Sequence, residues 1–167
     1  VNKFIGDAIM AMWGAPTKTA HDAQYAIQAA LDMRVALNEL NERRLARGQS
    51  PIKIGTGIHG GEAVAGTIGS RSRLEYTIIG DTVNQASRIE ASTKAFGVDL
   101  LISSEVAEKV ATEFLVEFLG AAEVKGKSEA LRLFGVNGFR DAAGQEVIIQ
   151  TPYSRYQAQA ADKVKIA

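Results

Sequence analysis

The sequence predicts an α+β domain, in which helices and antiparallel hairpins are mixed and do not alternate strictly along the chain. Short apolar runs meet at glycine-containing turns, as at Gly6 and Asp7. Residues 20–47 carry apolar side chains at an approximate 3.6-residue period, which predicts one long helix. Hairpin patterns outnumber strand–helix–strand patterns, so a doubly wound parallel sheet is disfavoured.

The first elements follow from these signals. A hairpin of two short strands is expected over residues 3–13. The long helix over 20–47 is expected to end at Gly48, because glycine readily adopts the left-handed conformation that closes a helix. A strand over 53–59 then turns at two glycines into a second strand over 62–65.

The middle of the chain contains the next strand and helix. The stretch 66–70 holds two glycines and is expected to be a flexible loop. A strand is expected over 74–79, followed by a helix over 82–94. Asp81 is the expected N-cap of that helix, because its carboxylate can accept a hydrogen bond from a free backbone N–H of the first turn.

The last elements are shorter and less regular. A strand over 100–102 and a small helix ending near Val110 are expected. Three closing strands are predicted at 114–118, 121–124 and 131–136. We therefore place the globular domain at residues 1–136, and we expect residues 137–167, which lose clear periodicity, to be a C-terminal extension or linker.

Composition excludes several classes of function. The chain has 167 residues, with 19 basic and 19 acidic side chains, so its formal net charge is zero. A general basic surface for nucleic acid is therefore not expected. The absence of cysteine excludes disulfides and thiol chemistry. No apolar run approaches the ~20 residues that span a bilayer, so we expect a cytoplasmic domain whose parent protein could still be anchored elsewhere.

Four polar residues are candidates for binding chemistry. Asn84 and Arg88 are spaced i and i+4 on the predicted helix, so an amide for a sugar hydroxyl lies beside a guanidinium for a phosphate. In isolation, a solvated helix face explains such a pair better. Lys125 precedes a glycine, which lets the backbone approach an anion, although a surface turn is the simpler explanation. Asp7 is a candidate magnesium ligand.

Taken together, these stretches resemble the catalytic domain of class III nucleotide cyclases, the adenylate and guanylate cyclases. The resemblance covers about residues 1–136. The matching segments occur in the family's order and are residues 3–11, 57–69, 76–84, 86–88 and 124–127. The resemblance implies a ferredoxin-like palm of the βαββαβ kind. It also implies a head-to-tail homodimer with active sites between protomers, and regulatory domains outside this chain.

The resemblance also implies roles for single residues. Lys3 and Thr77 fall where the family selects the base. Asn84 falls where the ribose is oriented, and Arg88 where the charge of the transition state is stabilised. Lys125 falls where the triphosphate is held.

The identity of the base can be argued from hydrogen bonding. Lys3 can only donate, which matches N1 of adenine, and the hydroxyl of Thr77 can accept from the 6-amino group. A guanine-reading site would need an acceptor such as glutamate at position 3. ATP is therefore the expected substrate, and 3′,5′-cyclic AMP and pyrophosphate are the expected products. The alternatives are a guanylate cyclase and a non-catalytic module for dimerisation or nucleotide sensing.

Asp7 resembles one of the family's two metal-binding aspartates, which hold Mg²⁺ or Mn²⁺. The motif that carries the other aspartate is not found in the sequence, and the first strand and first helices of the palm would precede Val1. A longer parent protein, a truncated chain, or elements exchanged with a partner copy would each explain this. We therefore expect the 167 residues alone to have little or no activity. Lys3 and Asp7 are expected to serve different active sites of the dimer.

Overall fold

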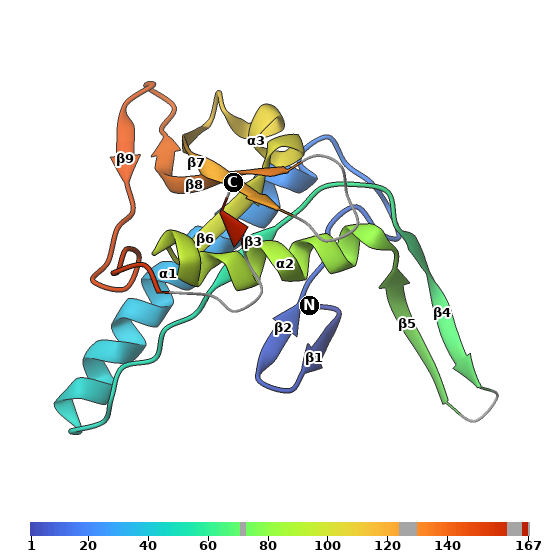
Figure 1. The fold of residues 1–167 in the computed structure, drawn as a ribbon, viewed down its shortest axis with the longest axis horizontal. Coiled ribbons are helices and arrows are strands. Elements are labelled where there is room, and N and C mark those ends of the chain that lie inside the picture. Colours follow the sequence, from blue (N-terminus) through green and yellow to red (C-terminus); the bar gives the residue numbers. More distant parts are fainter. Residues whose placement is uncertain (71–72, 124–129, 160–164, 167) are drawn as a thin grey trace.

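Most strands of the computed structural model lie in one mixed sheet (Figure 1). The structure describes residues 1–70, 73–123, 130–159 and 165–166. The sheet has the strand order β10-β7-β8-β6-β3. Its members are β10 (Lys165–Ile166), β7 (Phe114–Glu123), β8 (Leu131–Arg140), β6 (Leu100–Ser103) and β3 (Thr56–Ile58). In the part of the sheet that the structure describes, β3 and β6 form the one parallel pair and the other pairs are antiparallel, which confirms the expected α+β class.

The sheet continues past the boundary expected at residue 136. That boundary falls inside β8, which pairs antiparallel with β7 over its whole length. The strand β9 (Glu146–Ile148) then pairs with the end of β8, with Gly138 opposite Ile148. Because β6 pairs with β8 near Leu133 and β9 pairs with it further along, the two strands share one edge of β8.

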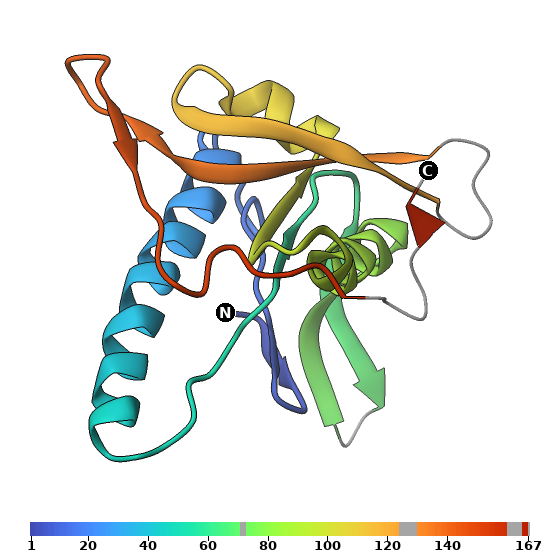
Figure 2. The same cartoon turned by 60° about the vertical axis from the view of Figure 1, so that its left-hand side comes forward.

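Helices cover both faces of the sheet (Figure 2). The long helix α1 (Asp22–Ala46) and the short helix α3 (Ser104–Val110) pack on one face, and α2 (Asp81–Phe96) packs on the other. Strand β6 is buried throughout, and its alternation divides the core: Leu100 and Ile102 contact the α1 and α3 side, whereas Leu101 contacts the α2 side. Among the described helices, none is both long and apolar enough to cross a membrane.

Two hairpins form sheets of their own. The first, β1 (Lys3–Ile5) with β2 (Ala8–Met10), confirms the expected N-terminal hairpin. The second joins β4 (Val64–Ser70) to β5 (Arg73–Ile79) and projects from the rest of the fold (Figure 1). The loop expected at 66–70 is wrong, because this stretch lies within β4. Its glycines pair in unbroken register with β5, so backbone hydrogen bonds hold an extended conformation that the side chains do not favour.

Several strand edges and apolar side chains are open. In the described part of the chain, β3 has β6 as its one strand neighbour, and β2 has only β1. On the first hairpin, Phe4 is 72% exposed and Ile9 is 56% exposed. Such open edges and exposed apolar side chains can pair with, or pack against, another chain.

The start of α2 differs from the expectation by one residue. Gly80, not Asp81, occupies the N-cap, with φ 146°, a value that favours glycine. Asp81 is instead the first helical residue, and its carboxylate accepts a hydrogen bond from Gln85 Nε2 one turn later at 3.0 Å. Its negative charge still lies in the first turn, where it suits the helix dipole.

Residues 149–159, here called the C-terminal strap, pack along the sheet and the end of α2. Ser154 is 3% exposed and accepts, through its carbonyl, a hydrogen bond from the backbone N–H of Asp99 at 3.1 Å. The Tyr156 N–H donates to the carbonyl of Gly97 at 2.9 Å, and the Gln159 N–H donates to that of Lys94 at 3.0 Å. The strap therefore supplies donors to carbonyls at the C-terminal end of α2.

Candidate active site

Two of the expected site residues lie on α2. Asn84 and Arg88 are both exposed and one helical turn apart, outside the buried face of the helix. Within the described residues, neither side chain makes a hydrogen bond or an ion pair. The helix is closed by Gly97, which has φ 65° and a backbone N–H that bonds back into the last turn. Both polar groups thus lie on a helix with a capped C-terminus, and they are available to a ligand.

The helix packs closely on the sheet because β3 carries a glycine. A Cβ placed on Gly57 would lie 2.2 Å from the backbone nitrogen of Glu90 and 2.6 Å from the carbonyl oxygen of Ala86. Only a residue without a side chain allows α2 to approach β3 this closely. Gly57 therefore helps to set the position of the helix that carries Asn84 and Arg88.

Thr77 lies on β5, a few residues before α2. The residue is 7% exposed, and its hydroxyl Oγ1 donates to Oδ1 of Asn2 at 3.3 Å. The amide Nδ2 of Asn2 in turn donates to the carbonyl oxygen of Tyr76 at 3.0 Å. Asn2 immediately precedes β1, so these contacts hold the start of the first hairpin against β5.

This contact joins the two segments that carry the base-reading candidates Lys3 and Thr77. Lys3 is the chain neighbour of Asn2 and is partly exposed on β1, where it pairs with Met10. In the part of the chain that is described, the Lys3 ammonium makes no hydrogen bond or ion pair. Asn2, which bridges the two segments, was not identified as a site residue from the sequence.

Asp7 lies at the turn of the first hairpin, next to Gly6 with φ 62°. Its carboxylate lies near that of Glu90 on α2. Burial raises the pKa of the Glu90 carboxyl, Lys94 lowers this pKa, and the charge of Asp7 raises it further. Although Glu90 is exposed as a residue, a Cβ at Gly55 would lie 3.0 Å from its Oε1, so the carboxylate end is partly covered.

The described residues do not by themselves make a metal site. Among them, no group of three or more histidine, aspartate and glutamate side chains is placed to hold a metal ion. Mg²⁺ needs about six oxygen ligands and usually takes one or two carboxylates together with substrate phosphates and water. Asp7 alone supplies one such ligand. Lys125, expected to hold the triphosphate, lies outside the described residues.

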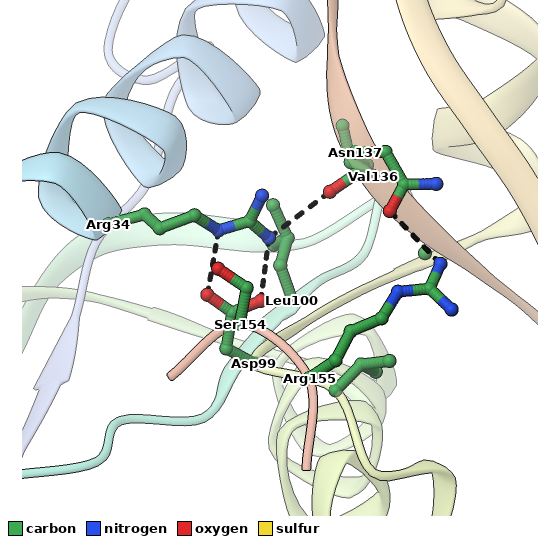
Figure 3. Close-up of a pocket in the computed structure, with 9 residues that line it drawn as sticks. Arg34, Asp99, Leu100, Val136, Asn137, Ser154 and Arg155 are labelled. Carbon is green, nitrogen blue, oxygen red and sulfur yellow. Dashed lines mark hydrogen bonds and ion pairs between the residues drawn. The ribbon is translucent and has the colours of Figure 1, made fainter. Parts of the chain in front are cut away.

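A small pocket elsewhere in the fold is structural. It surrounds Arg34 of α1 and Asp99, which precedes β6, and has a volume of about 10 Å³, enough for roughly one water molecule. Figure 3 shows Arg34 reaching Asp99 and the backbone of Val136, with Ser154 of the C-terminal strap beside them. Nothing of nucleotide size fits there.

All three nitrogens of the Arg34 guanidinium donate hydrogen bonds. Its Nε and Nη2 donate to the two oxygens of Asp99 at 2.7 and 2.6 Å, and its Nη1 donates to the carbonyl of Ile149 at 2.6 Å. Burial raises the pKa of the Asp99 carboxyl, and Arg34 opposes that rise. The sequence carried a signal for this pair, because Arg34 follows Ile27 by seven residues and so falls on the apolar stripe of α1.

Comparisons with known proteins agree on one protein family. Residues 2–137 match the family described as the adenylate and guanylate cyclase catalytic domain. Adenylate cyclase 1 of Rhizobium meliloti is 38% identical over 136 residues, which cover 81% of this chain and 20% of that protein. The adenylate cyclase of Anabaena cylindrica is 38% identical over 143 residues, which cover 81% of this chain and 28% of that protein. The chain thus spans between a fifth and a third of the length of these relatives.

Solved structures agree with the fold. The guanylyl cyclase Cya2 superposes with a TM-score of 0.74 at 30% identity, covering 87% of this chain and 73% of that one. The adenylyl cyclase CyaB from P. aeruginosa superposes with a TM-score of 0.75 at 33% identity, covering 81% of this chain and 69% of that one. The structural neighbours therefore include proteins named for either purine nucleotide.

Proposed function

Since the chain belongs to the adenylate and guanylate cyclase catalytic domain family, we propose that it carries most of an active site that converts ATP to 3′,5′-cyclic AMP and pyrophosphate. The observation that favours ATP is the pairing of a cation, Lys3, with a hydroxyl, Thr77, on two segments that Asn2 links. Lys3 donates to N1 of adenine. The oxygen of Thr77 accepts from the 6-amino group.

Guanine presents the opposite pattern at both positions. Its N1–H is a donor facing the donor Lys3, and its O6 is an acceptor facing Thr77. A site built on hydrogen bonds rejects a ligand that leaves buried polar groups unpaired, by up to ~10⁴-fold. The structural likeness to a guanylyl cyclase keeps GTP as the second candidate.

The residues of α2 supply positioning and charge. The amide of Asn84 holds the ribose so that its 3′-oxygen faces the α-phosphorus. A bond forms between these two atoms, the bond from the α-phosphorus to the bridging oxygen of pyrophosphate breaks, and the 3′-hydroxyl proton leaves to solvent. Arg88, one turn along, places its guanidinium fork on the phosphate oxygens where negative charge increases. Lys125 is proposed to hold the triphosphate.

The metal requirement is only partly met by this chain. Asp7 would be one ligand of Mg²⁺ or Mn²⁺, and the bound cation would neutralise phosphate charge. The motif that carries the family's other metal-binding aspartate is not found in this sequence, so we assign no step to the metal. For the same reason, and because strand edges remain open, we propose that these 167 residues alone are inactive.

A homodimer would place Lys3 and Asp7 in different active sites. Exposed apolar side chains on the second hairpin support an interface there, with Val64 67%, Leu74 61% and Ile79 52% exposed. Regulatory domains would lie outside this chain, and a cytoplasmic location would give access to ATP. A non-catalytic nucleotide-sensing module is the remaining alternative, and the single matched carboxylate is the observation in its favour.

The proposal is tested by measuring cyclic AMP formed from Mg-ATP by the natural protein and its variants. Arg88→Ala and Asn84→Ala are each expected to lower kcat about 10²-fold or more, as loss of a charge-stabilising or positioning group does. Ser87→Ala, on the same helix and also exposed, is the matched control and should retain activity. If Arg88→Ala keeps full activity, the proposed role of α2 is wrong.

A further inference from the structure

The Asn2 side chain bridges two segments that are more than 70 residues apart in sequence. Its Nδ2 donates to the backbone carbonyl of Tyr76 at 3.0 Å, and its Oδ1 accepts from the hydroxyl of Thr77 at 3.3 Å. The two partners are consecutive residues of β5. Asn2 itself continues the ladder of the first hairpin, because its backbone N–H donates to the carbonyl of Met10 at 2.8 Å.

These contacts fix the direction of each hydrogen bond. The carbonyl oxygen of Tyr76 can only accept, so the amino group of the Asn2 amide must face it. The amide oxygen is then the atom that faces Thr77. Since that oxygen can only accept, the Thr77 hydroxyl must donate its proton to Asn2.

A committed proton changes what Thr77 offers to a ligand. A hydroxyl has one proton and two lone pairs, and when free it rotates to act as donor or acceptor. With its proton held by Asn2, the Thr77 oxygen has only lone pairs left for another partner. It can then pair with an amino group and cannot pair with a carbonyl oxygen.

We propose that Asn2 is a specificity-determining residue, which acts through Thr77 and makes it an obligate acceptor. The inference rests on the proposed function, in which Thr77 faces the 6-position of the purine. The 6-amino group of adenine satisfies such an acceptor, whereas the O6 of guanine does not. Thr77 without Asn2 could serve either base, and Lys3 alone would discriminate.

The test is a double-mutant cycle in the natural protein, with kcat/KM measured for ATP and for GTP. Asn2→Leu keeps the approximate size of the side chain and removes both of its hydrogen bonds. The ATP-to-GTP ratio of kcat/KM is expected to fall about 10-fold, as one hydrogen bond's worth of discrimination is lost. In a Thr77→Val background, where no hydroxyl remains, the same change should alter the ratio less than about twofold.

Two further variants separate this role from a general effect on folding. Asn2→Asp keeps an oxygen acceptor for Thr77, so it should keep the preference for ATP. Asn38→Leu, at a half-buried position of α1 where the amide donates to Glu42, is the matched control and should leave the ratio unchanged. Should Asn2→Leu fold poorly, Asn2→Ser carries the same expectation of a lower ratio.

The outcomes distinguish this inference from the proposed function. If the natural protein prefers ATP and Asn2→Leu or Asn2→Ser leaves that preference intact, the inference is wrong and the proposed function stands. Equal losses with both nucleotides, or the same change in ratio in the Thr77→Val background, also overturn it. If the natural protein makes no cyclic AMP, the proposed function itself fails.

Discussion

Arg34 and Asp99, which are 65 residues apart in sequence, form a bidentate ion pair that joins α1 to the start of β6. The side chains are only 5% and 14% exposed, and Arg34 also holds the carbonyls of Val136 and Ile149. The pair therefore ties one helix, two neighbouring strands and the C-terminal strap to a single point.

Removing one partner of this pair should strongly destabilise the fold. Arg34→Met is expected to lower the free energy of unfolding by about 3–5 kcal/mol, because a buried carboxylate is left without a counter-charge. The double change Arg34→Met with Asp99→Leu should lose less than the sum of the single changes. Glu146→Gln, which breaks a half-exposed ion pair with Arg140, is the control and should cost about 1 kcal/mol or less. Denaturant unfolding measures the free energy of unfolding of the two single variants, the double variant and the control. Additive losses at Arg34 and Asp99 would show that the two side chains do not stabilise the fold as a pair.

The glycine of β3 provides a test of how α2 is positioned. Gly57→Ala would place a Cβ 2.2 Å from the backbone of Glu90, so the helix must move away from the sheet. We expect a loss of about 1–3 kcal/mol in stability and a lower kcat in the natural protein, because Asn84 and Arg88 move with the helix. Gly66→Ala on β4, where a Cβ would meet no atom within 4 Å, should leave both quantities nearly unchanged. Equal effects at the two glycines would show that helix position is not the cause.

The pKa of Glu90 should depend on Asp7. Replacing Asp7 by asparagine removes a nearby negative charge, so the raised pKa of Glu90 should fall while remaining above its ordinary value, because burial is the larger cause. NMR titration of the Glu90 carboxyl measures this shift. An unchanged pKa would mean that the first hairpin does not bring Asp7 near α2.

The Glu90 carboxyl should also make the stability of the fold depend on pH. A carboxyl whose pKa is raised on folding binds its proton more tightly in the folded state. The Glu90 carboxyl therefore makes its full contribution to the free energy of unfolding below its pKa in the unfolded chain, near 4.5. This contribution is lost as the pH rises through the raised pKa of the folded state. Glu90→Gln should accordingly be more stable than the natural chain at pH 7 and gain little at pH 4. A variant that is less stable at pH 7 would contradict this sign.

The C-terminal strap should stabilise the end of α2. The hydroxyl of Tyr156 donates to the carbonyl of Val98 at 2.8 Å, and its ring lies under the Lys53 ammonium. Tyr156→Phe keeps the ring and removes the hydrogen bond, so we expect a loss of about 1 kcal/mol and faster amide exchange in the last turn of α2. Tyr153→Phe, in the same strap, is the control. Faster exchange throughout the protein would indicate general destabilisation instead.

Local patterns predicted much of this fold. The period of α1 and the glycine turn of the first hairpin are properties of neighbouring residues, and both elements were found close to their expected bounds. The course of β4 was missed because glycines at 66 and 69 indicate a loop when read alone. Pairing with β5 overrides that preference, and such pairing depends on residues that the local pattern does not include.

The site could be predicted only in part for a related reason. Asn84 and Arg88 lie on one helix, so their spacing placed them together. The bridge from Asn2 to Thr77 and the nearness of Asp7 to Glu90 join distant segments, and nothing in the local sequence specifies them. Family resemblance indicated roles for single residues, but not which neighbour orients each.

In the proposed site Lys3 and Thr77 read the base, and the ratio of kcat/KM for ATP and GTP, measured in the natural protein and in Lys3→Glu, tests this most directly. We expect the natural protein to prefer ATP. We also expect Lys3→Glu, which replaces a donor by an acceptor, to lower the ATP-to-GTP ratio of kcat/KM by at least about 10-fold. A natural protein that prefers GTP, or a ratio that Lys3→Glu leaves unchanged, would contradict it.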